Sequence, residues 1–217
     1  MRPKHLAISL SKLRPHPCEN VILEQYATEG DLASYWMLAV DELDGFQDSI
    51  VADLGAGNGI LGIAALLLGA SKVVFVETDV SVIAALEKNI ASLQADLQAK
   101  AEIVHATVGL DDLTLDDVDI VVMNPPWGVQ REKADRPFLH AAFSSGATAV
   151  HVLHSDRASH LEPFAKDHGW CAEAVLRTEF RLPAMYEHHA QRKGKTDVKC
   201  WRFFRKGDAR LARDEDA

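Results

Sequence analysis

The sequence has few cysteines, and they follow no ligand or disulfide pattern. Cys18, Cys171 and Cys200 are spread over 217 residues, and no two form a Cys-x-x-Cys pair. Small stapled scaffolds and structural zinc sites need paired or clustered cysteines. The cysteine content therefore argues against both, and we expect reduced thiols.

Long apolar runs are also missing. The longest, residues 60–70, is too short to cross a bilayer and is expected to form a buried helix. Near the N-terminus, Ser9, Ser11, Lys12 and Arg14 interrupt any apolar segment that a secretory signal would need. We therefore predict a cytoplasmic protein without a membrane span.

The chain contains no internal repeat, low-complexity linker or break in composition. With 217 residues, of which 47% are hydrophobic, it is long enough to bury one sizeable core. We predict a single domain over residues 1–217, with an extension and a first helix in 1–47, a core in 48–206 and a charged tail in 207–217.

Charge is distributed unevenly. The formal net charge is −9, but residues 177–206 contain nine Lys or Arg against three acids, a net charge of about +6. The remainder is therefore about −15. This asymmetry favours a surface that binds a polyanion on an otherwise acidic body, although basic loops without a ligand are common.

From residue 48 onward, short β-branched segments alternate with amphipathic ones, as in repeated strand–helix units around a parallel sheet. We predict seven strands, at 50–54, 72–77, 101–106, 118–123, 148–154, 171–179 and 198–204. Helices are expected at 31–43, 59–68, 81–93, 137–145 and 157–168. The last two strands have no helix between them and should pair antiparallel.

A glycine-rich turn follows the first predicted strand. Asp53 ends the strand, and Gly55, Gly57 and Gly59 precede an apolar helix. Glycines permit a tight turn and close approach of a ligand to the backbone, and a helix N-terminus offers free N–H groups. A nucleotide-like cofactor fits here, the alternative being a generic strand-to-helix turn. The G-x-G-x-G spacing differs from the G-x-G-x-x-G of dinucleotide sites.

An acid ends the second predicted strand. The carboxylate of Glu77 can accept hydrogen bonds from both hydroxyls of a ribose. Glu77 or Asp79 can instead cap the following helix, and for Asp79 we favour that interpretation.

The fourth predicted strand runs into Asn124-Pro125-Pro126-Trp127-Gly128. Two prolines stiffen the backbone between an amide and an aromatic ring. The Asn124 side-chain oxygen and the Pro125 carbonyl can accept both N–H bonds of an exocyclic amine such as that of adenine, while Trp127 stacks on the base. Such a corner acts through orientation and electrostatics. A simple proline turn is the alternative.

At these motifs the chain resembles the class I S-adenosylmethionine-dependent methyltransferases that modify amino nitrogens. More narrowly, it is similar to the archaeal and eukaryotic enzymes that make N6-methyladenosine in small-subunit ribosomal RNA. The resemblance covers roughly residues 20–205 and is carried by EQYAT at 24–28, DLGAGNG at 53–59, NPPWG at 124–128 and LPAMY at 182–186. It implies a Rossmann-like α/β fold, with a seven-stranded, mostly parallel sheet and helices on both faces.

The resemblance also implies a set of site residues. The catalytic corner would be Asn124, Pro125, Pro126 and Trp127. The residues expected to bind S-adenosylmethionine are Gln25, Thr28, Asp53, Gly55, Gly57, Asn58, Ile60, Glu77, Thr78, Thr107, Val108 and Asn124. Two positions depart from the family: Thr107 stands where an acid often holds the adenine amine, and Trp127 replaces the usual Phe.

RNA contacts and a partner complete these expectations. Phosphate contacts are expected from His188, His189, Arg192, Lys193 and Lys195, with a solvated loop as the alternative. The related enzymes act with a small zinc-containing methyltransferase activator protein that pairs along a strand, so a heterodimer is expected. His151 and His154 alternate on one strand without the ligand spacing of a metal site, and we expect no metal.

Other functions stay open. A protein-glutamine N5 methyltransferase would present a similar conjugated amide to the same Asn-Pro-Pro corner. DNA adenine is a weaker substrate candidate because no target-recognition domain is evident. A methyltransferase-fold binding module without activity would have to keep Asp53, Glu77 and Asn124 for no catalytic purpose. An NAD-dependent oxidoreductase is disfavoured by the glycine spacing.

Overall fold

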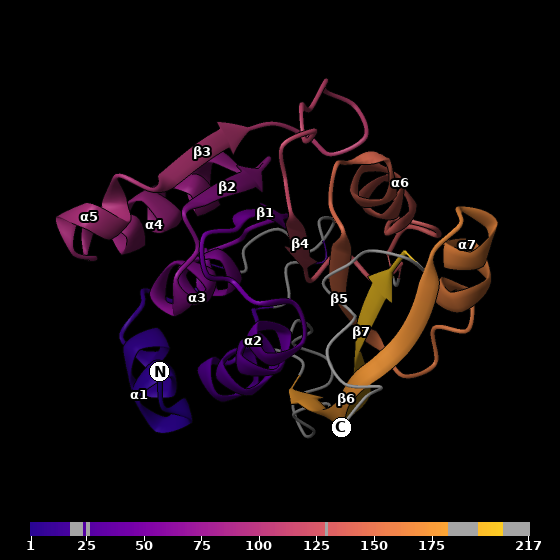
Figure 1. The fold of residues 1–217 in the computed structure, drawn as a ribbon, viewed down its shortest axis with the longest axis horizontal. Helices are drawn as coiled ribbons and strands as arrows, with labels where there is room; N and C mark the ends of the chain where they lie inside the picture. Colours follow the sequence, from indigo (N-terminus) through magenta and orange to yellow (C-terminus); the bar gives the residue numbers. More distant parts are fainter. Residues whose placement is uncertain (18–23, 25–26, 129, 182–194, 206–217) are drawn as a thin grey trace, which may run out of the picture.

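The fold is built on a seven-stranded sheet (Figure 1). The computed structural model describes residues 1–17, 24, 27–128, 130–181 and 195–205. Its strands are β1 (Ile50–Leu54), β2 (Lys72–Glu77), β3 (Ala101–His105), β4 (Ile120–Met123), β5 (Ala149–Ser155), β6 (Cys171–Arg181) and β7 (Lys195–Phe204). Its helices are α1 (Pro3–Ser11), α2 (Gly30–Asp44), α3 (Ile60–Leu68), α4 (Val80–Ala91), α5 (Ala95–Gln98), α6 (Arg136–Ser144) and α7 (Leu161–Asp167).

The strand order is β3-β2-β1-β4-β5-β7-β6. Strands β1 to β5 pair in parallel, whereas β7 is antiparallel to both β5 and β6. The order therefore reverses between β1 and β4, where the chain turns from one half of the sheet to the other. In open α/β sheets this reversal opens a crevice at the carboxyl ends of the strands.

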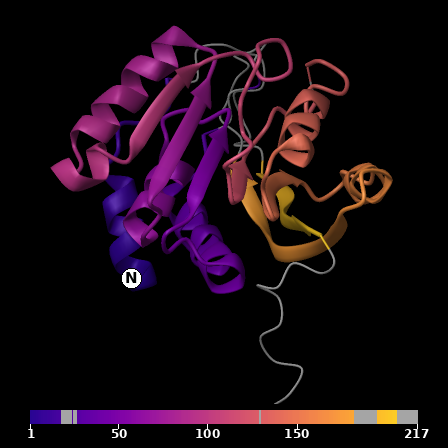
Figure 2. The same cartoon turned by 45° about the horizontal axis from the view of Figure 1, so that its top comes forward.

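Each face of the sheet is covered by helices (Figures 1 and 2). Val51 of β1 and Phe75 of β2 belong to a core shared with α1, α2, α3 and α4. Leu54 of β1 and Val76 of β2 belong to the opposite core, which α6 and α7 cover. Alternate residues of one strand point to opposite faces, so strands buried on both sides are apolar throughout.

The predicted α/β architecture and all seven strands are confirmed, including the antiparallel final pair. Two helices were not predicted, α1 and the single turn α5. Helix α1 begins with Pro3 in its first turn and buries Leu6 and Leu10 against the core, which its short sequence alone does not reveal. The predicted helix at 157–168 begins only at Leu161, because turns occupy the preceding residues.

The boundaries of the C-terminal strands were also predicted too short. Strand β7 begins at Lys195 and β6 continues to Arg181, and these two residues pair with each other in the antiparallel ladder. The pairing extends the strands beyond their apolar segments. None of the helices in the described ranges is both long and apolar enough to cross a bilayer.

Candidate active site

A cavity of about 520 Å³ lies at the carboxyl ends of β1, β2 and β4, where the strand order reverses. This volume lies within the usual range for small-molecule sites. The sequence-predicted residues among its lining are Thr28, Asp53, Gly55, Gly57, Asn58, Ile60, Glu77, Thr78, Thr107, Val108, Asn124 and Pro126. The fold therefore brings together residues separated by almost 100 positions in the chain.

The glycine turn keeps part of this cavity open. Gly55, Gly57 and Gly59 all have positive φ values, of 71°, 57° and 85°, which glycine adopts without strain. A Cβ atom at Gly57 would lie 2.9 Å from the ring of His16, and one at Gly55 would lie 3.0 Å from Phe138. Gly55 and Gly57 are therefore required both by their positive φ values and by the lack of room for a Cβ atom.

Asp53 is buried beneath the turn, with 1% of its surface exposed. Its Oδ2 accepts a hydrogen bond of 2.8 Å from the backbone N–H of Gly62 in α3. Burial raises the pKa of Asp53 to about 8, and the nearby Glu77 carboxylate adds to the shift, while the Gly62 hydrogen bond opposes it. The Asp53 carboxyl group is thus poised to titrate near neutral pH.

The Glu77 carboxylate organises the backbone around it. Oε2 accepts a hydrogen bond from Gly57, and Oε1 accepts bonds from the backbone N–H groups of Thr78 and Asp79. Asp79 itself caps α4 by accepting from Ser81, as predicted. Glu77 therefore joins the ends of β1 and β2 while it lines the cavity.

Two hydroxyl groups meet at the position of Thr107, where the resembling family often has an acid. The Oγ1 atoms of Thr78 and Thr107 lie 2.7 Å apart, and the Thr107 backbone N–H donates to Asp111 Oδ2. The carboxylate nearest in sequence to Thr107 thus binds the backbone, and Asp111 is not among the residues that line the cavity. This wall presents threonine hydroxyls and the apolar Val108.

The Asn124 side chain is held from both ends. Its Nδ2 donates to Thr28 Oγ1 at 3.2 Å, and its Oδ1 accepts from the indole Nε1 of Trp127, also at 3.2 Å. These contacts set which end of the amide is the oxygen. Because a carbonyl oxygen has two lone pairs, Oδ1 can accept a second donor from a bound molecule.

The two other members of the corner are placed beside the cavity. Pro125 and Trp127 are not among the residues that line it, although Pro126 is. The Trp127 ring packs on the imidazole of His154, with centroids 5.9 Å apart and planes 27° from parallel. The indole is thus supported from behind by β5.

Residues before α2 close the cavity, and sequence reasoning missed most of them. Glu24 is 3% exposed, and its Oε1 accepts a hydrogen bond of 2.6 Å from the backbone N–H of Gln130. Asn58, which was predicted to face the cofactor, also donates to the Arg14 carbonyl. Burial lowers the pKa of His16, another lining residue. Only the EQYAT motif pointed to this segment.

The residues predicted to contact RNA lie in a segment that the structure describes only at its ends. Gln25 of the cofactor set, and His188, His189, Arg192 and Lys193, lie outside the described residues, as does the side chain of Lys195. The structure corrects the simple charge count of this segment. Arg202 is 3% exposed and bonds to Asp44 and Glu173, so its charge is neutralised within the fold.

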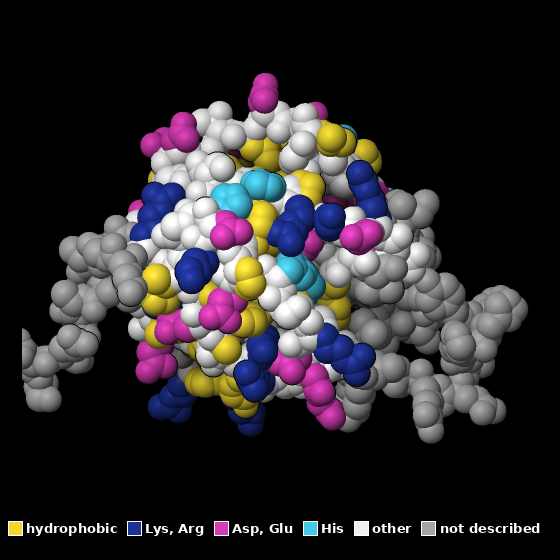
Figure 3. Space-filling model, turned by 90° about the vertical axis from the view of Figure 1, so that its right-hand side faces the viewer, with side chains coloured by type: hydrophobic (Ala, Val, Ile, Leu, Met, Phe, Trp, Pro, Cys, Tyr) yellow, Lys and Arg dark blue, Asp and Glu magenta, His cyan; other side chains and the backbone are white. Residues whose placement is uncertain are grey.

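Other basic side chains of the segment also have partners. Lys199 lies 3.0 Å from Asp156 and over the ring of Trp201. On the face that Figure 3 shows, the described Lys and Arg side chains are interspersed with Asp and Glu. The described part of that face therefore has no uniformly positive patch.

Comparison with known proteins identifies relatives over most of the chain. The family described as Conserved hypothetical protein 95 matches residues 33–165. The rRNA N(6)-adenosine-methyltransferase METTL5 of Danio rerio is 28% identical, over 94% of this chain and 99% of that protein. The rRNA N(6)-adenosine-methyltransferase metl-5 of Caenorhabditis elegans is 30% identical, over 84% of this chain and 88% of that protein.

A solved structure agrees with this grouping. PH1948 from Pyrococcus horikoshii, provisionally assigned as an RNA methyltransferase, is 35% identical and superposes with a TM-score of 0.83. The match covers 94% of this chain and 98% of that protein. The relatives therefore share the fold along almost the whole length of the chain.

Proposed function

This chain belongs to the Conserved hypothetical protein 95 family, and on that premise we propose that it methylates the N6 amine of an adenosine in small-subunit ribosomal RNA. The observation that carries the proposal is the placement of Asn124. Its amide lies at the cavity wall, fixed by Thr28 and Trp127, at the end of β4. The names of two relatives, which describe rRNA N6-adenosine methyltransferases, support the reaction and the class of RNA.

The cavity suits S-adenosylmethionine as the methyl donor. Its volume of about 520 Å³, its glycine wall and its acids fit a cationic nucleoside. Glu24, which also lines the cavity, can accept a hydrogen bond from the cofactor, because its buried Oε2 has no hydrogen-bond partner within the described ranges. When bound, S-adenosylmethionine supplies an electrophilic methyl group. In this proposal Glu77 binds the ribose, and Thr78, Thr107 and Val108 surround the adenine of the cofactor.

Asn124 would orient the amine that is methylated. An adenine N6 amine is a weak nucleophile because its lone pair is delocalised into the ring. Hydrogen bonds from its two N–H groups to Asn124 Oδ1 and the Pro125 carbonyl favour a more tetrahedral nitrogen. Since Thr28 and Trp127 already hold the amide, little reorganisation is needed when the base arrives.

The base must leave its stack to reach this corner. Trp127 would then stack on the base, with its own ring backed by His154. His188, His189, Arg192, Lys193 and Lys195 would contact phosphates. A small zinc-containing activator protein would add a strand to an edge of the sheet. Within the described residues, β3 is the strand at one edge and β6 is the strand at the other.

The test is transfer of labelled methyl from S-adenosylmethionine to purified small-subunit RNA, naked and in subunits, with and without a candidate activator. Nucleoside mass spectrometry should locate the label in N6-methyladenosine. Asn124→Ala should lower transfer by about 100-fold or more, as loss of an oriented donor or acceptor does. Its affinity for S-adenosylmethionine, measured by calorimetric titration, should stay within roughly tenfold, because one neutral hydrogen bond contributes about 1 kcal/mol.

Gln47→Ala is the matched control, since this exposed amide precedes β1 at the opposite end of the sheet. It should leave transfer unchanged. Label on protein glutamine instead of RNA would replace the proposed substrate with the rival one. Cofactor binding that disappears in Asn124→Ala would contradict the role assigned to this residue.

A further inference from the structure

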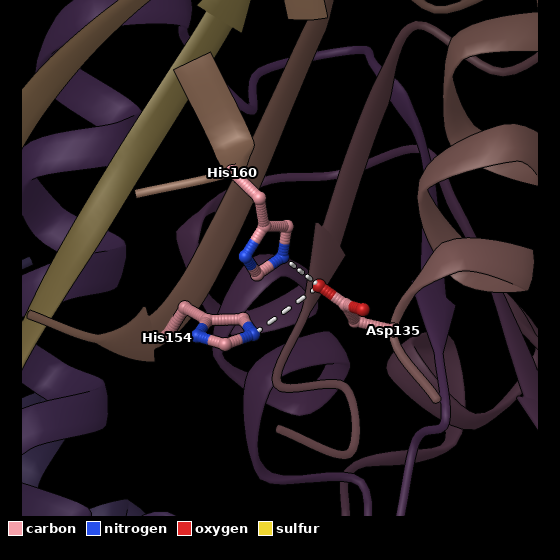
Figure 4. A group of neighbouring side chains, drawn as sticks. All are labelled: Asp135, His154 and His160. Carbon is pink, nitrogen blue, oxygen red and sulfur yellow. Dashed lines mark hydrogen bonds and ion pairs between the residues drawn. The ribbon is translucent and has the colours of Figure 1, made fainter. Parts of the chain in front are cut away.

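Three side chains that contact neither cofactor nor base in the proposed reaction converge beside the Asn-Pro-Pro-Trp corner (Figure 4). Asp135 is the N-cap residue of α6, His154 lies near the end of β5, and His160 is the N-cap residue of α7. Both imidazoles direct Nε2 at the same carboxylate oxygen. Asp135 Oδ2 is 2.5 Å from His160 Nε2 and 3.4 Å from His154 Nε2.

These groups are typical ligands of a divalent transition metal. One candidate donor atom from each residue lies within 4.8 Å of the other two. In a tetrahedral zinc site, bonds of about 2.0–2.2 Å separate neighbouring ligand atoms by roughly 3.4 Å. The Asp135–His154 distance already has this value. The Asp135–His160 pair, now hydrogen-bonded, would need to open by about 1 Å.

Burial supports a ligand at this position. The side chains of Asp135 and His154 are 3% and 2% exposed. Nδ1 of His154 has no hydrogen-bond partner in the described part of the chain, and the only partner of Nε2 there is the long contact with Asp135. A buried imidazole nitrogen without a good hydrogen bond is costly, and a metal ion bonded to Nε2 would give that nitrogen a strong partner.

We propose that Asp135, His154 and His160 bind one zinc-type divalent ion, with water in the remaining position. His160 is 34% exposed, so solvent reaches the cluster from that side. Two neutral imidazoles and one carboxylate leave a single negative charge to offset the ion. The resulting cross-link joins α6, β5 and the start of α7 directly behind the Trp127 ring. The site does not depend on the proposed methyl transfer.

The test uses the full chain without a histidine tag, stripped of metal and titrated with Co²⁺ or Zn²⁺ alone. We expect one equivalent of Co²⁺ to produce the intense visible absorption of a four-coordinate site, and Zn²⁺ to displace it. Loss of a residue that only hydrogen-bonds to a metal ligand typically weakens metal binding by about 10- to 100-fold. Because His160 is itself a proposed ligand, His160→Gln should weaken binding by more than this. Asp135→Asn should do the same.

Two controls separate this site from adventitious binding by other histidines. His168→Gln changes an exposed histidine at the other end of α7, and the double variant His188→Gln, His189→Gln removes the adjacent pair in the basic segment. Both should bind metal as the wild type does. Circular dichroism checks that His160→Gln folds, and Zn²⁺ should raise the Tm of the wild type and both controls only.

A wild-type chain that takes up no stoichiometric metal would overturn the proposal, and so would a folded His160→Gln variant with unchanged affinity. Loss of metal binding in the double control would move the site to the basic segment and equally overturn it. Methyl transfer is measured separately, so failure of metal binding leaves the proposed function standing, and the reverse also holds.

Discussion

At the scale of single residues, the cavity depends on carboxyl groups that bind backbone rather than solvent. Asp53 and Glu77 lie at the ends of neighbouring strands, and each accepts hydrogen bonds from main-chain N–H groups of other elements. Both are almost fully buried. The same side chains therefore shape the turn and present carboxyl oxygens to the cavity.

Asp53 makes stability depend on pH. Its pKa of about 8 in the folded chain exceeds the value near 3.8 of an exposed aspartate, because burial disfavours its charged form. The folded state then holds a proton that the unfolded state has released, so stability is greatest below the unfolded pKa and falls as pH rises towards 8. Asp53→Asn removes this contribution.

We therefore expect the unfolding free energy of the wild type to fall, relative to Asp53→Asn, by more than about 1 kcal/mol between pH 5 and pH 8. Urea unfolding without cofactor at several pH values measures this difference. Asp31→Asn, at an exposed position in α2, should follow the wild type. Parallel pH profiles for the wild type and Asp53→Asn would show that Asp53 is ionised throughout.

At the scale of elements, contacts between helices and strands hold the site in place. Asp44 at the end of α2 binds His151 of β5 and Arg202 of β7. Burial alone would raise the pKa of Asp44, but hydrogen bonds from these two residues lower it below its usual value. Helix α2 is therefore fastened to the antiparallel part of the sheet.

Helix α3 approaches β2 so closely that one helical position admits no side chain. A Cβ atom at Gly62 would lie 2.2 Å from the buried ring of Phe75. Alanine is normally the better helix former by about 1 kcal/mol. We nevertheless expect Gly62→Ala to lower the unfolding free energy by about 1–3 kcal/mol, the usual cost of overpacking a core.

Gly30→Ala is the matched control, because a Cβ there makes only ordinary contacts at 3.5 Å or more. Chemical denaturation of both variants measures the difference. Equal stability in Gly62→Ala and Gly30→Ala would mean that α3 shifts away from β2 without cost. In that event the position of the Gly62 N–H donor to Asp53 would also change.

At the scale of the whole molecule, the proposed function requires RNA to bind a chain whose net charge is −9 and whose basic residues gather in its C-terminal segment. Arg202 and Lys199 are engaged by acids within the fold. We infer that phosphate contacts fall on Arg192, Lys193 and Lys195, as the proposed function requires.

Replacing these three residues together with Gln should weaken RNA binding and reduce its salt dependence. Each lost phosphate contact lowers the slope of log affinity against log salt concentration by about 1. The control Lys4→Gln, Lys12→Gln, Lys88→Gln changes net charge equally at exposed positions elsewhere. Equal slopes in the two triple variants, measured by filter binding over a range of salt, would remove the basic segment from the RNA interface.

The sequence alone determined the approximate positions of all seven strands, the antiparallel final pair, the glycine turn and the stiff corner at Asn124. These features depend on residues close together in the chain, where apolar periodicity, the conformational freedom of Gly55 and the rigidity of Pro125 act locally. The family resemblance rests on the same short motifs. Helix α1 escaped prediction because burial of Leu6 and Leu10 against distant helices, which no local pattern reveals, stabilises it.

Only the tertiary structure decided which distant side chains meet. Glu24 accepts a hydrogen bond from Gln130, Asp44 pairs with Arg202, and Asp135 contacts both His154 and His160. Such pairs leave no periodic trace in the sequence, because the packing of whole elements sets their distance and burial. Burial then decides their chemistry: the sequence shows that Asp53 ends a strand, but its raised pKa arises from the helices and strands that exclude water around it.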